Sequence, residues 1–274
     1  RRLANLWGIA TSMLAMTLGL AVLLWILFIL FSNGFAALDW NIVSQDTPAP
    51  GTEGGGLRNA IVGSLLMVGL SVLVATPIGI LAGIYLTEFG DQSKTAALTR
   101  FVTDIMLSAP SITIGLFVYA IAVATVGRFS GYAGSLALTL IAVPVVMRTT
   151  ENMLRLVPGS LREAAFALGA PRWKVSLSVT LRAAKSGVIT GVLLAIARIS
   201  GETAPLLFTA LNNQFFNDDM SKPMANLPVV IFQFAMSPYE NWIRLAWGGA
   251  LLITLTVLVL NILARVFFRD KTTS

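Results

Sequence analysis

Long apolar runs alternate with short polar segments along the whole chain. A helix needs roughly 20 residues to cross the hydrocarbon of a bilayer, so each run of that length predicts a membrane span. Six runs qualify, at positions 8–31, 58–86, 101–127, 131–150, 186–211 and 246–268. The first is too long for the core of a signal peptide and more spans follow it, so we expect it to remain as a helix. The pattern predicts an all-α membrane protein with six transmembrane helices.

Two connecting segments are long. Residues 32–56 are rich in Gly, Pro, Asn and Asp and are expected to be irregular. Residues 212–245 contain an apolar stretch at 227–236 that is too short to span. We expect this stretch either as a short helix on the membrane surface or as one folded back into the protein. The chain divides into an N-terminal helix with its outer loop (1–57) and a core of five helices (58–274) that carries a cytoplasmic loop (151–185).

Composition supports a membrane protein and removes several kinds of chemistry. Charged residues make up 12% of the chain and hydrophobic residues 56%, whereas a soluble domain carries about 25% charged residues. The chain has no Cys and no His, which excludes thiol nucleophiles, disulfides, imidazole bases and metal sites built from these residues. The carboxylates are scattered, so we expect no catalytic residues, and an integral-membrane enzyme is the least favoured class.

The basic residues indicate the orientation of the spans. With the N-terminus placed in the cytoplasm, fourteen of the nineteen Lys and Arg residues fall on the cytoplasmic side and four on the outer side. Cytoplasmic loops of membrane proteins carry such an excess of Lys and Arg. We therefore expect a multi-pass protein of the bacterial inner membrane with both termini in the cytoplasm. The pI of about 10.1 reflects this topology and not a nucleic-acid-binding patch.

The cytoplasmic loop at 151–185 predicts two short helices. Ser160 lies three residues before Glu163, which is the spacing of a capping box at a helix N-terminus. Gly169 is placed as the C-terminal cap of that helix, and Pro171 suits the first turn of a second helix that runs to about position 182. Pattern alone leaves open whether this is a solvated basic loop or a docking element.

The residues Glu163-Ala164-Ala165, followed after three positions by Gly169, resemble the EAA signature of ABC-importer permeases. In that family the pattern continues nine residues later as Ile-x-Leu-Pro, where this chain has Val179-Thr180-Leu181-Arg182. The resemblance implies that the loop forms the coupling helix that docks on the ATPase subunit. The chain has no G-x-x-x-x-G-K-[ST] sequence, so we expect no cofactor here, with ATP and Mg²⁺ bound by a partner ATPase.

Two opposite charges lie inside the fifth apolar run. Arg198 and Glu202 are four residues apart and share a face of a regular helix. A charge at mid-membrane costs ~2.5–3.5 kcal/mol, so such residues usually face a cavity or a partner. One interpretation is a structural ion pair. The other is a cation site for an anionic solute, since the planar guanidinium binds oxyanions through paired hydrogen bonds, with Gly201 and Pro205 opening backbone amides nearby.

The run GETAPLLFTA from position 201 is similar to the fifth span of the PstA-type phosphate permease family. The similarity extends over most of the chain and implies the type I ABC importer permease (MetI-like) fold. It also implies a substrate pathway that includes Arg198, Ser200, Glu202 and Thr203, with inorganic phosphate as the substrate. The implied partners are a PstC-type permease in a heterodimer, two copies of an ATPase subunit and a periplasmic phosphate-binding protein.

Other classes remain as alternatives. One is an ABC permease for another oxyanion or solute, such as sulfate or molybdate. A second is an ion-gradient-driven secondary transporter, against which the EAA-like loop and the absence of an obvious internal repeat both argue. A third is a membrane scaffold or sensor, in which the Arg198–Glu202 pair is purely structural. Copurification of an ATPase subunit separates an ABC permease from the last two classes.

The charge bias generates a topology prediction. Reporter fusions placed after Lys185 and after Lys271 are expected to report a cytoplasmic location, and a fusion after Asn217 a periplasmic one, because Lys and Arg accumulate on the inner side. A pair of reporters, one active only in each compartment, makes the measurement. A cytoplasmic signal at Asn217 would contradict the six-span topology.

Overall fold

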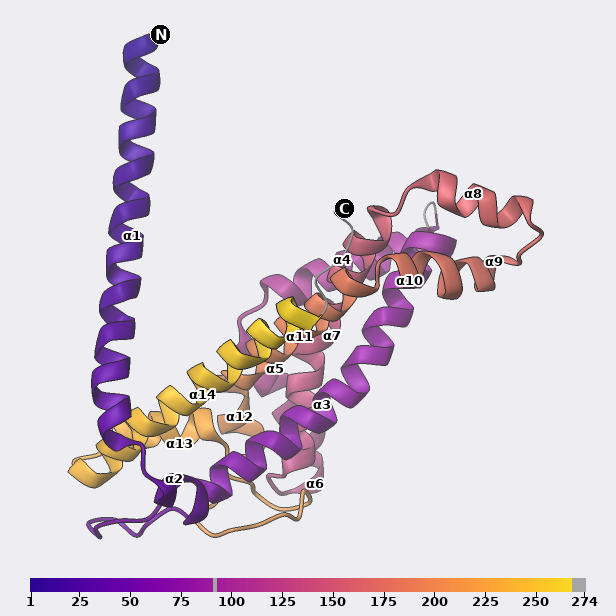
Figure 1. Cartoon of the computed structure of the whole chain (residues 1–274). Coiled ribbons are helices and arrows are strands. Elements are labelled where there is room, and N and C mark those ends of the chain that lie inside the picture. The colour runs from indigo at the N-terminus through magenta and orange to yellow at the C-terminus, as the bar shows by residue number, and fades with distance from the viewer. Residues whose placement is uncertain (91–92, 268–274) are drawn as a thin grey trace.

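The computed structural model describes residues 1–90 and 93–267, and these fold into helices joined by short loops (Figure 1). The N-terminal half contains α1 (Arg2–Ala37), α2 (Trp40–Ser44), α3 (Arg58–Ile84), the π-helical turn η1 (Tyr85–Phe89), α4 (Lys94–Ser108), α5 (Ser111–Val118), η2 (Tyr119–Val123), α6 (Ala124–Val126) and α7 (Gly131–Arg155). The C-terminal half contains α8 (Gly159–Ala167), α9 (Arg172–Lys174), η3 (Val175–Thr180), α10 (Leu181–Ala183), α11 (Lys185–Ser200), α12 (Ala204–Thr209), α13 (Leu227–Ala235) and α14 (Glu240–Phe267).

Four helices in the described part of the chain are long and apolar enough to cross a membrane unbroken: α1, α3 with η1, α7 and α14. Two further helix pairs are long and apolar enough only when the two bent halves of each are counted together as one span. One pair joins α4 to the α5–α6 segment with a bend of 106°, and the other joins the α9–α10 segment to α11 with a bend of 74°. The all-α prediction is confirmed, and the number of spans agrees with the prediction when each bent pair counts as one.

The third predicted span, 101–127, is wrong as a single helix. The chain is extended at Ala109, with a ψ of 138°, and the helix resumes only after Pro110. A residue that precedes proline is driven out of the α region by a clash with the proline ring, which explains the position of the break. The polar α4 therefore turns away from α5 and lies against the η1 end of α3, where the Arg100 guanidinium donates to the Leu86 carbonyl at 2.8 Å.

The bend between α10 and α11 forms although Arg182 occupies the place of the family's proline. Helix α10 ends at Ala183, and Ala184 has φ and ψ of −87° and 1° before α11 begins at Lys185. Ala184 is itself buried, in a cluster with Ile84, Leu154 and Val188. The bend at Ala184 is therefore produced by tertiary packing and not by a proline.

Helices α3 and α7 pack closely because the second half of a buried stripe on α3, from Ser71 through Ala75 and Gly79 to Gly83, consists of small residues. The whole stripe is made of Asn59, Gly63, Met67, Ser71, Ala75, Gly79 and Gly83. A Cβ atom added at Gly79 would lie 2.7 Å from Cβ of Val146, and one added at Gly83 would lie 2.7 Å from Cβ of Thr150. Small residues let backbones approach in a membrane, where van der Waals packing replaces the hydrophobic effect between helices.

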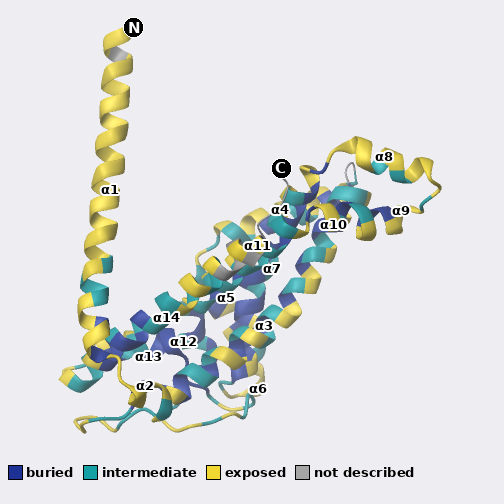
Figure 2. Cartoon of the chain, in the orientation of Figure 1, coloured by how far each residue is buried: buried dark blue, intermediate teal, exposed yellow. Residues whose placement is uncertain are grey.

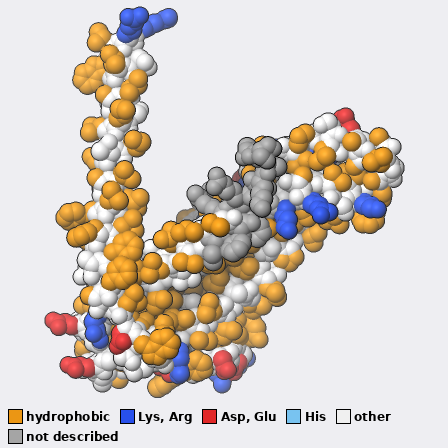
Figure 3. Space-filling view, in the orientation of Figure 1, with side chains coloured by type: hydrophobic (Ala, Val, Ile, Leu, Met, Phe, Trp, Pro, Cys, Tyr) orange, Lys and Arg blue, Asp and Glu red, His pale blue; other side chains and the backbone are white. Residues whose placement is uncertain are grey.

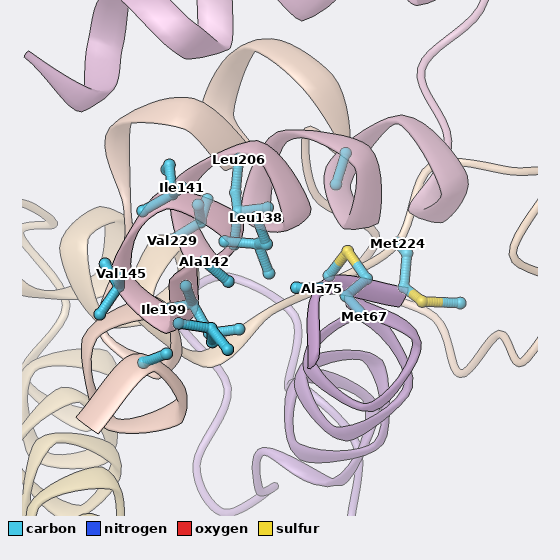
Figure 4. Packing of buried hydrophobic residues seen from close by; sticks show 13 residues of the cluster. Met67, Ala75, Leu138, Ile141, Ala142, Val145, Ile199, Leu206, Met224 and Val229 are labelled. Carbon is cyan, nitrogen blue, oxygen red and sulfur yellow. The ribbon is translucent and has the colours of Figure 1, made fainter. Parts of the chain in front are cut away.

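The main apolar cluster is centred on this helix pair (Figure 4). Met67 of α3 and Leu138 of α7 meet Ile199 of α11, Leu206 of α12 and Val229 of α13. All five side chains are almost completely buried. The cluster therefore joins five elements that are far apart in sequence, and it fixes both sides of the break between α11 and α12.

The two long loops contain short helices. The predicted stretch 227–236 contains α13 (Leu227–Ala235), which is folded back against α3 and α14, as one of the two expectations stated. Asn226 caps it by accepting from the Val229 N–H at 3.0 Å. The segment 32–56 is less irregular than expected, because α1 continues to Ala37 and α2 follows, with Asp39 accepting from the Trp40 N–H.

Helix α1 stands apart from the bundle and is exposed over almost its whole length (Figures 1 and 2). It meets α14 near its C-terminal end, where Gly34 lies against Leu251. The N-terminus and the projecting α8–α10 segment lie at one end of the molecule, while α2 and α6 lie at the other (Figure 1). Basic side chains mark the tip of α1 and the α8–α10 segment, whereas the opposite end mixes acidic and basic side chains (Figure 3).

The close contact between α3 and α7 generates a matched pair of variants. Gly79→Val is expected to destabilise the protein by ~1–3 kcal/mol, because the added side chain is forced into Val146. Gly69→Val is the control, since a Cβ at Gly69 of the same helix meets nothing within 4 Å. Thermal unfolding of the detergent-solubilised protein measures the difference. Equal transition temperatures for the two variants would show that the small-residue contact does not limit stability.

Candidate functional site

The fifth span is interrupted where the sequence places a glycine and a proline. Helix α11 ends at Ser200, and α12 begins at Ala204 with Pro205 in its first turn. The Gly201 N–H donates to the Arg198 carbonyl at 3.3 Å, which tightens the last turn of α11. Pro205 has no N–H to donate and its ring would clash with the Gly201 carbonyl of a continuous helix. The predicted run 186–211 is thus not one helix: it is divided between α11 and α12, and the helix pair apolar and long enough to span here is Arg172–Ala183 with Lys185–Ser200.

Arg198 lies on the outward face of α11. The opposite face, formed by Val188, Gly191, Ala195 and Ile199, is buried in the bundle. Arg198 follows Thr190 and Leu194 at intervals of four residues, all three exposed, and its side chain is 40% exposed. The structure therefore leaves a cation on an uncovered surface near the C-terminal end of α11, beside the break at Gly201.

The pairing of Arg198 with Glu202 is loose. Nε of Arg198 lies 4.0 Å from Oε1 of Glu202, whose side chain is 15% exposed. By comparison, Nε of Arg100 lies 2.7 Å from Oε1 of Glu151. An N···O separation of 4.0 Å is beyond hydrogen-bond range. Glu202 therefore attracts the guanidinium of Arg198 but accepts no hydrogen bond from Nε. This geometry fits a cation held ready for an anion better than it fits a closed structural pair.

Two other sequence-predicted pathway residues lie at this break. Thr203 is half-buried directly after Glu202, and its carbonyl accepts from the Leu207 N–H at 3.2 Å. Ser200 lies elsewhere, because it lines an apolar cavity of about 170 Å³ between α3, α11, α13 and α14. Its hydroxyl donates to the Ile196 carbonyl at 2.7 Å. The structure therefore brings Arg198, Glu202 and Thr203 together and separates Ser200 from them.

The loop from 151 to 185 forms an arm that projects from the bundle (Figure 1). Gly169 has a φ of +79° and terminates α8, as expected, with the Ala170 N–H donating back to the Ala165 carbonyl at 3.2 Å. The predicted capping box is wrong. Pro158 occupies the N-cap position and α8 begins at Gly159, so Ser160 is already inside the helix and makes no cap.

No residue of α8 is buried. Glu163 and Ala164 are exposed, and Ala165 is intermediate. At the tip, Leu168 is 89% exposed, and Trp173 on α9 is 62% exposed. An apolar surface that points away from the protein body is typical of a docking site for another protein. The arrangement therefore favours a docking element over a solvated connector.

A buried carboxylate at the base of the arm was missed from the sequence. Glu151 of α7 is 1% exposed and accepts from Nε of Arg100 and from Nη2 of Arg155, both at 2.7 Å. Nη1 of Arg148 lies 3.4 Å away, and Arg148 also pairs with Asp104 of α4. The spacing of Arg148, Glu151 and Arg155 on one helix was a usable signal, whereas Arg100 comes from α4 and gave none.

The opposite end of the molecule carries a polar hollow of about 630 Å³, lined by residues 51–54, 238–241 and Arg244. In the loop between α12 and α13, the Ser221 hydroxyl and backbone N–H donate to Asp219 and lower its pKa to about 2, with Lys222 adding a smaller effect. In the described part of the chain no cluster of three His, Cys, Asp or Glu residues is arranged to hold a metal.

Comparison with known families identifies one model that covers most of the chain. Residues 75–270 match the family described as binding-protein-dependent transport system inner membrane component. Among curated relatives, the phosphate transport system permease protein PstA of Yersinia pestis is 57% identical over 99% of this chain and 92% of its own length. The protein of the same name from Pasteurella multocida is 58% identical over 99% of this chain and 96% of its own length.

Solved structures share the fold at low sequence identity. The MetNI methionine ABC transporter in an inward-facing conformation matches 78% of this chain and 94% of its own, with a TM-score of 0.62 and 19% identity. A bacterial alginate ABC transporter in complex with an alginate pentasaccharide-bound periplasmic protein matches 98% of this chain and 96% of its own. Its TM-score is 0.69 at 13% identity.

Proposed function

This chain belongs to the family of binding-protein-dependent transport system inner membrane components, and we propose that it is the phosphate permease subunit of an ABC importer. Relatives that carry this function in their names are similar to it over nearly its whole length. The permease is a multi-pass inner-membrane subunit that performs no catalysis itself. The fold shared with importer permeases supports the same assignment.

The proposed partners follow from what the chain lacks and from the surfaces that it leaves uncovered. It has no phosphate-binding loop for ATP, so a separate ATPase supplies hydrolysis, in two copies as the family resemblance implies. The exposed arm with Glu163, Ala164, Ala165 and Gly169 docks on one of them. A PstC-type permease covers the outward face of α11, and a periplasmic phosphate-binding protein delivers the substrate. The arm and both termini lie on the cytoplasmic side, as the basic residues favour.

The observation that carries the proposal is the exposed cation at the broken fifth span. A lipid-facing Arg198 would cost ~2.5–3.5 kcal/mol, so this face of α11 borders a water-lined path between two permease subunits. The guanidinium fork holds two oxygens of a phosphate ion, and Glu202 at 4.0 Å orients the fork. ATP-driven closure of the ATPase pair then moves the arms and switches the path between its outward- and inward-facing states.

Substrate selection has a chemical basis at the same place. At neutral pH phosphate retains a proton that it can donate, whereas sulfate has none. In this proposal the Glu202 carboxylate, 4.0 Å from Nε of Arg198, accepts that hydrogen bond, which favours phosphate over sulfate. Arsenate, which also retains a proton, is expected to compete with phosphate for transport.

Uptake of labelled phosphate into vesicles that contain the assembled transporter tests the role of Arg198. Arg198→Lys is expected to weaken uptake and Arg198→Gln nearly to abolish it, because only the guanidinium fork binds two oxygens at once. If the residue served only the ion pair, removing it alone would strand Glu202 at a cost of ~3–5 kcal/mol, and Arg198→Gln with Glu202→Gln would restore folding and transport together. Near-normal uptake by this double variant would remove Arg198 from the pathway.

The arm generates a second prediction. Glu163→Ala and Gly169→Val are expected to insert normally but to lose ATPase copurification, because a side chain at a φ of +79° strains the tip and a docking contact disappears. Gly159→Val is the matched control, since Gly159 has no positive φ and a Cβ there meets nothing within 4 Å. Copurification of the ATPase with all three variants would show that the arm is a solvated connector and not a docking element.

A further inference from the structure

Arg162, in the first half of α8, connects three elements through one side chain. Its Nη1 donates to the Val157 carbonyl at 2.7 Å and its Nη2 to the Leu154 carbonyl at 2.8 Å, which satisfies two acceptors at the C-terminal end of α7. Its Nε and Nη2 each lie 3.0 Å from Oε1 of Glu88 in η1, the turn that ends α3. A guanidinium is the one side chain with enough donors, in a fixed plane, for all of these contacts.

The burial of this contact contrasts with the exposure of the helix that carries it. Glu88 is 8% exposed and Arg162 20% exposed in their side chains, whereas α8 has no buried residue. On the bundle side of α8, a hollow of about 580 Å³ lies between Glu88, Arg162, Phe166 and Arg172. Apolar packing therefore does little to hold α8 to the bundle, and the Arg162 contacts are the principal polar attachment among the described residues.

The η1 turn, which carries Glu88, is also held to the bundle by a second arginine. Leu86, two residues before Glu88, accepts from Arg100, whose Nε binds the buried Glu151 of α7. The η1 turn is therefore fixed to α7 from one side through Arg100 and to α8 from the other through Arg162. Any displacement of α8 acts on the ends of α3 and α7 together.

From these ends the packed helices lead to the candidate pathway. Helix α7 contacts α11 closely, with Thr149 against Gly191, and α11 carries Arg198 at its other end. The interface between α3 and α7 has no room for independent sliding, because Gly79 and Gly83 lie against the backbone and side chains of α7. A displacement of Arg162 therefore moves α3 and α7 together, as a rigid pair, and is not taken up by local rearrangement.

We propose that Arg162 is a positioning residue that transmits movement of the arm to the transmembrane bundle, through its joint hold on Glu88 and on the carbonyl end of α7. The proposal rests on the proposed function as an ABC permease. It distinguishes docking from transmission: the exposed tip of the arm binds the ATPase, and Arg162 turns the movement of the docked arm into movement of α3 and α7. Loss of Arg162 therefore uncouples ATP hydrolysis from transport without releasing the ATPase.

The test measures the number of phosphate ions imported per ATP hydrolysed, using the complete transporter and its binding protein in proteoliposomes. Arg162→Gln and Glu88→Gln are expected to retain the ATPase and its hydrolysis while this ratio falls at least about tenfold, since each removes hydrogen bonds to a charged group. Arg162→Lys, which keeps the charge but has fewer donors, is expected to give an intermediate ratio. A purely structural role would lower complex yield or thermal stability and leave the ratio unchanged.

Arg182→Gln is the matched control, because Arg182 is an exposed arginine of the same arm that makes no recorded side-chain contact in the described residues. A normal ratio in this variant with low ratios in Arg162→Gln and Glu88→Gln supports the proposal. A wild-type ratio in either test variant, or an equal fall in the control, overturns it. If Arg162→Gln does not assemble, Glu88→Gln decides alone, since it leaves the Leu154 and Val157 carbonyls bound to Arg162. Failure of the proposed function would appear separately, as absent phosphate uptake by the wild-type complex.

Discussion

The close approach of α3 to α7 is the constraint on which the rest of the structure depends. In a membrane, two helices gain no hydrophobic free energy by leaving the lipid for each other, so contact area and interhelical hydrogen bonds must hold them. The small residues that recur at every fourth position in the second half of α3 provide that contact. The Ser71 hydroxyl adds a hydrogen bond to the Ser135 carbonyl at 2.9 Å. Helices α11, α12 and α13 then pack on this pair through one apolar cluster, which fixes the break in the fifth span.

Charged side chains play two different roles at the two ends of this scaffold. Glu151 is buried, the Glu88 side chain is 8% exposed, and arginines hold both at hydrogen-bond distance, so that loss of Arg162 would leave the Glu88 charge without its partner. These pairs fasten α4, α7, α8 and the end of α3. Arg198 and Glu202 are more exposed and lie 4.0 Å apart. Either side chain can therefore bind a ligand without first breaking a hydrogen bond to the other. The distance within each pair therefore separates charges that hold helices to one another from the candidate substrate-binding charges.

Among the described residues, three surfaces of the isolated chain are left exposed. Helix α1 is apolar and unburied over most of its length, the tip of the arm exposes Leu168 and Trp173, and α11 exposes Arg198. For an isolated subunit, an arginine exposed to lipid and an apolar arm tip exposed to water are both energetically unfavourable. The fold of this subunit therefore supplies a rigid bundle whose function depends on an assembly with other chains.

Local sequence determined the features that follow from single residues or regular patterns. Run length gave the spans, Gly169 gave the end of α8, and Gly201 with Pro205 gave the break beside Arg198, because each acts on its own backbone within a few residues. The resemblance in the fifth span gave the phosphate assignment. The burial of α13, the bend at Ala184, and the pairs Arg100–Glu151 and Arg162–Glu88 were decided by the tertiary structure alone. These contacts join residues up to 74 positions apart, and which arginine reaches which carboxylate depends on how the packed helices place their ends.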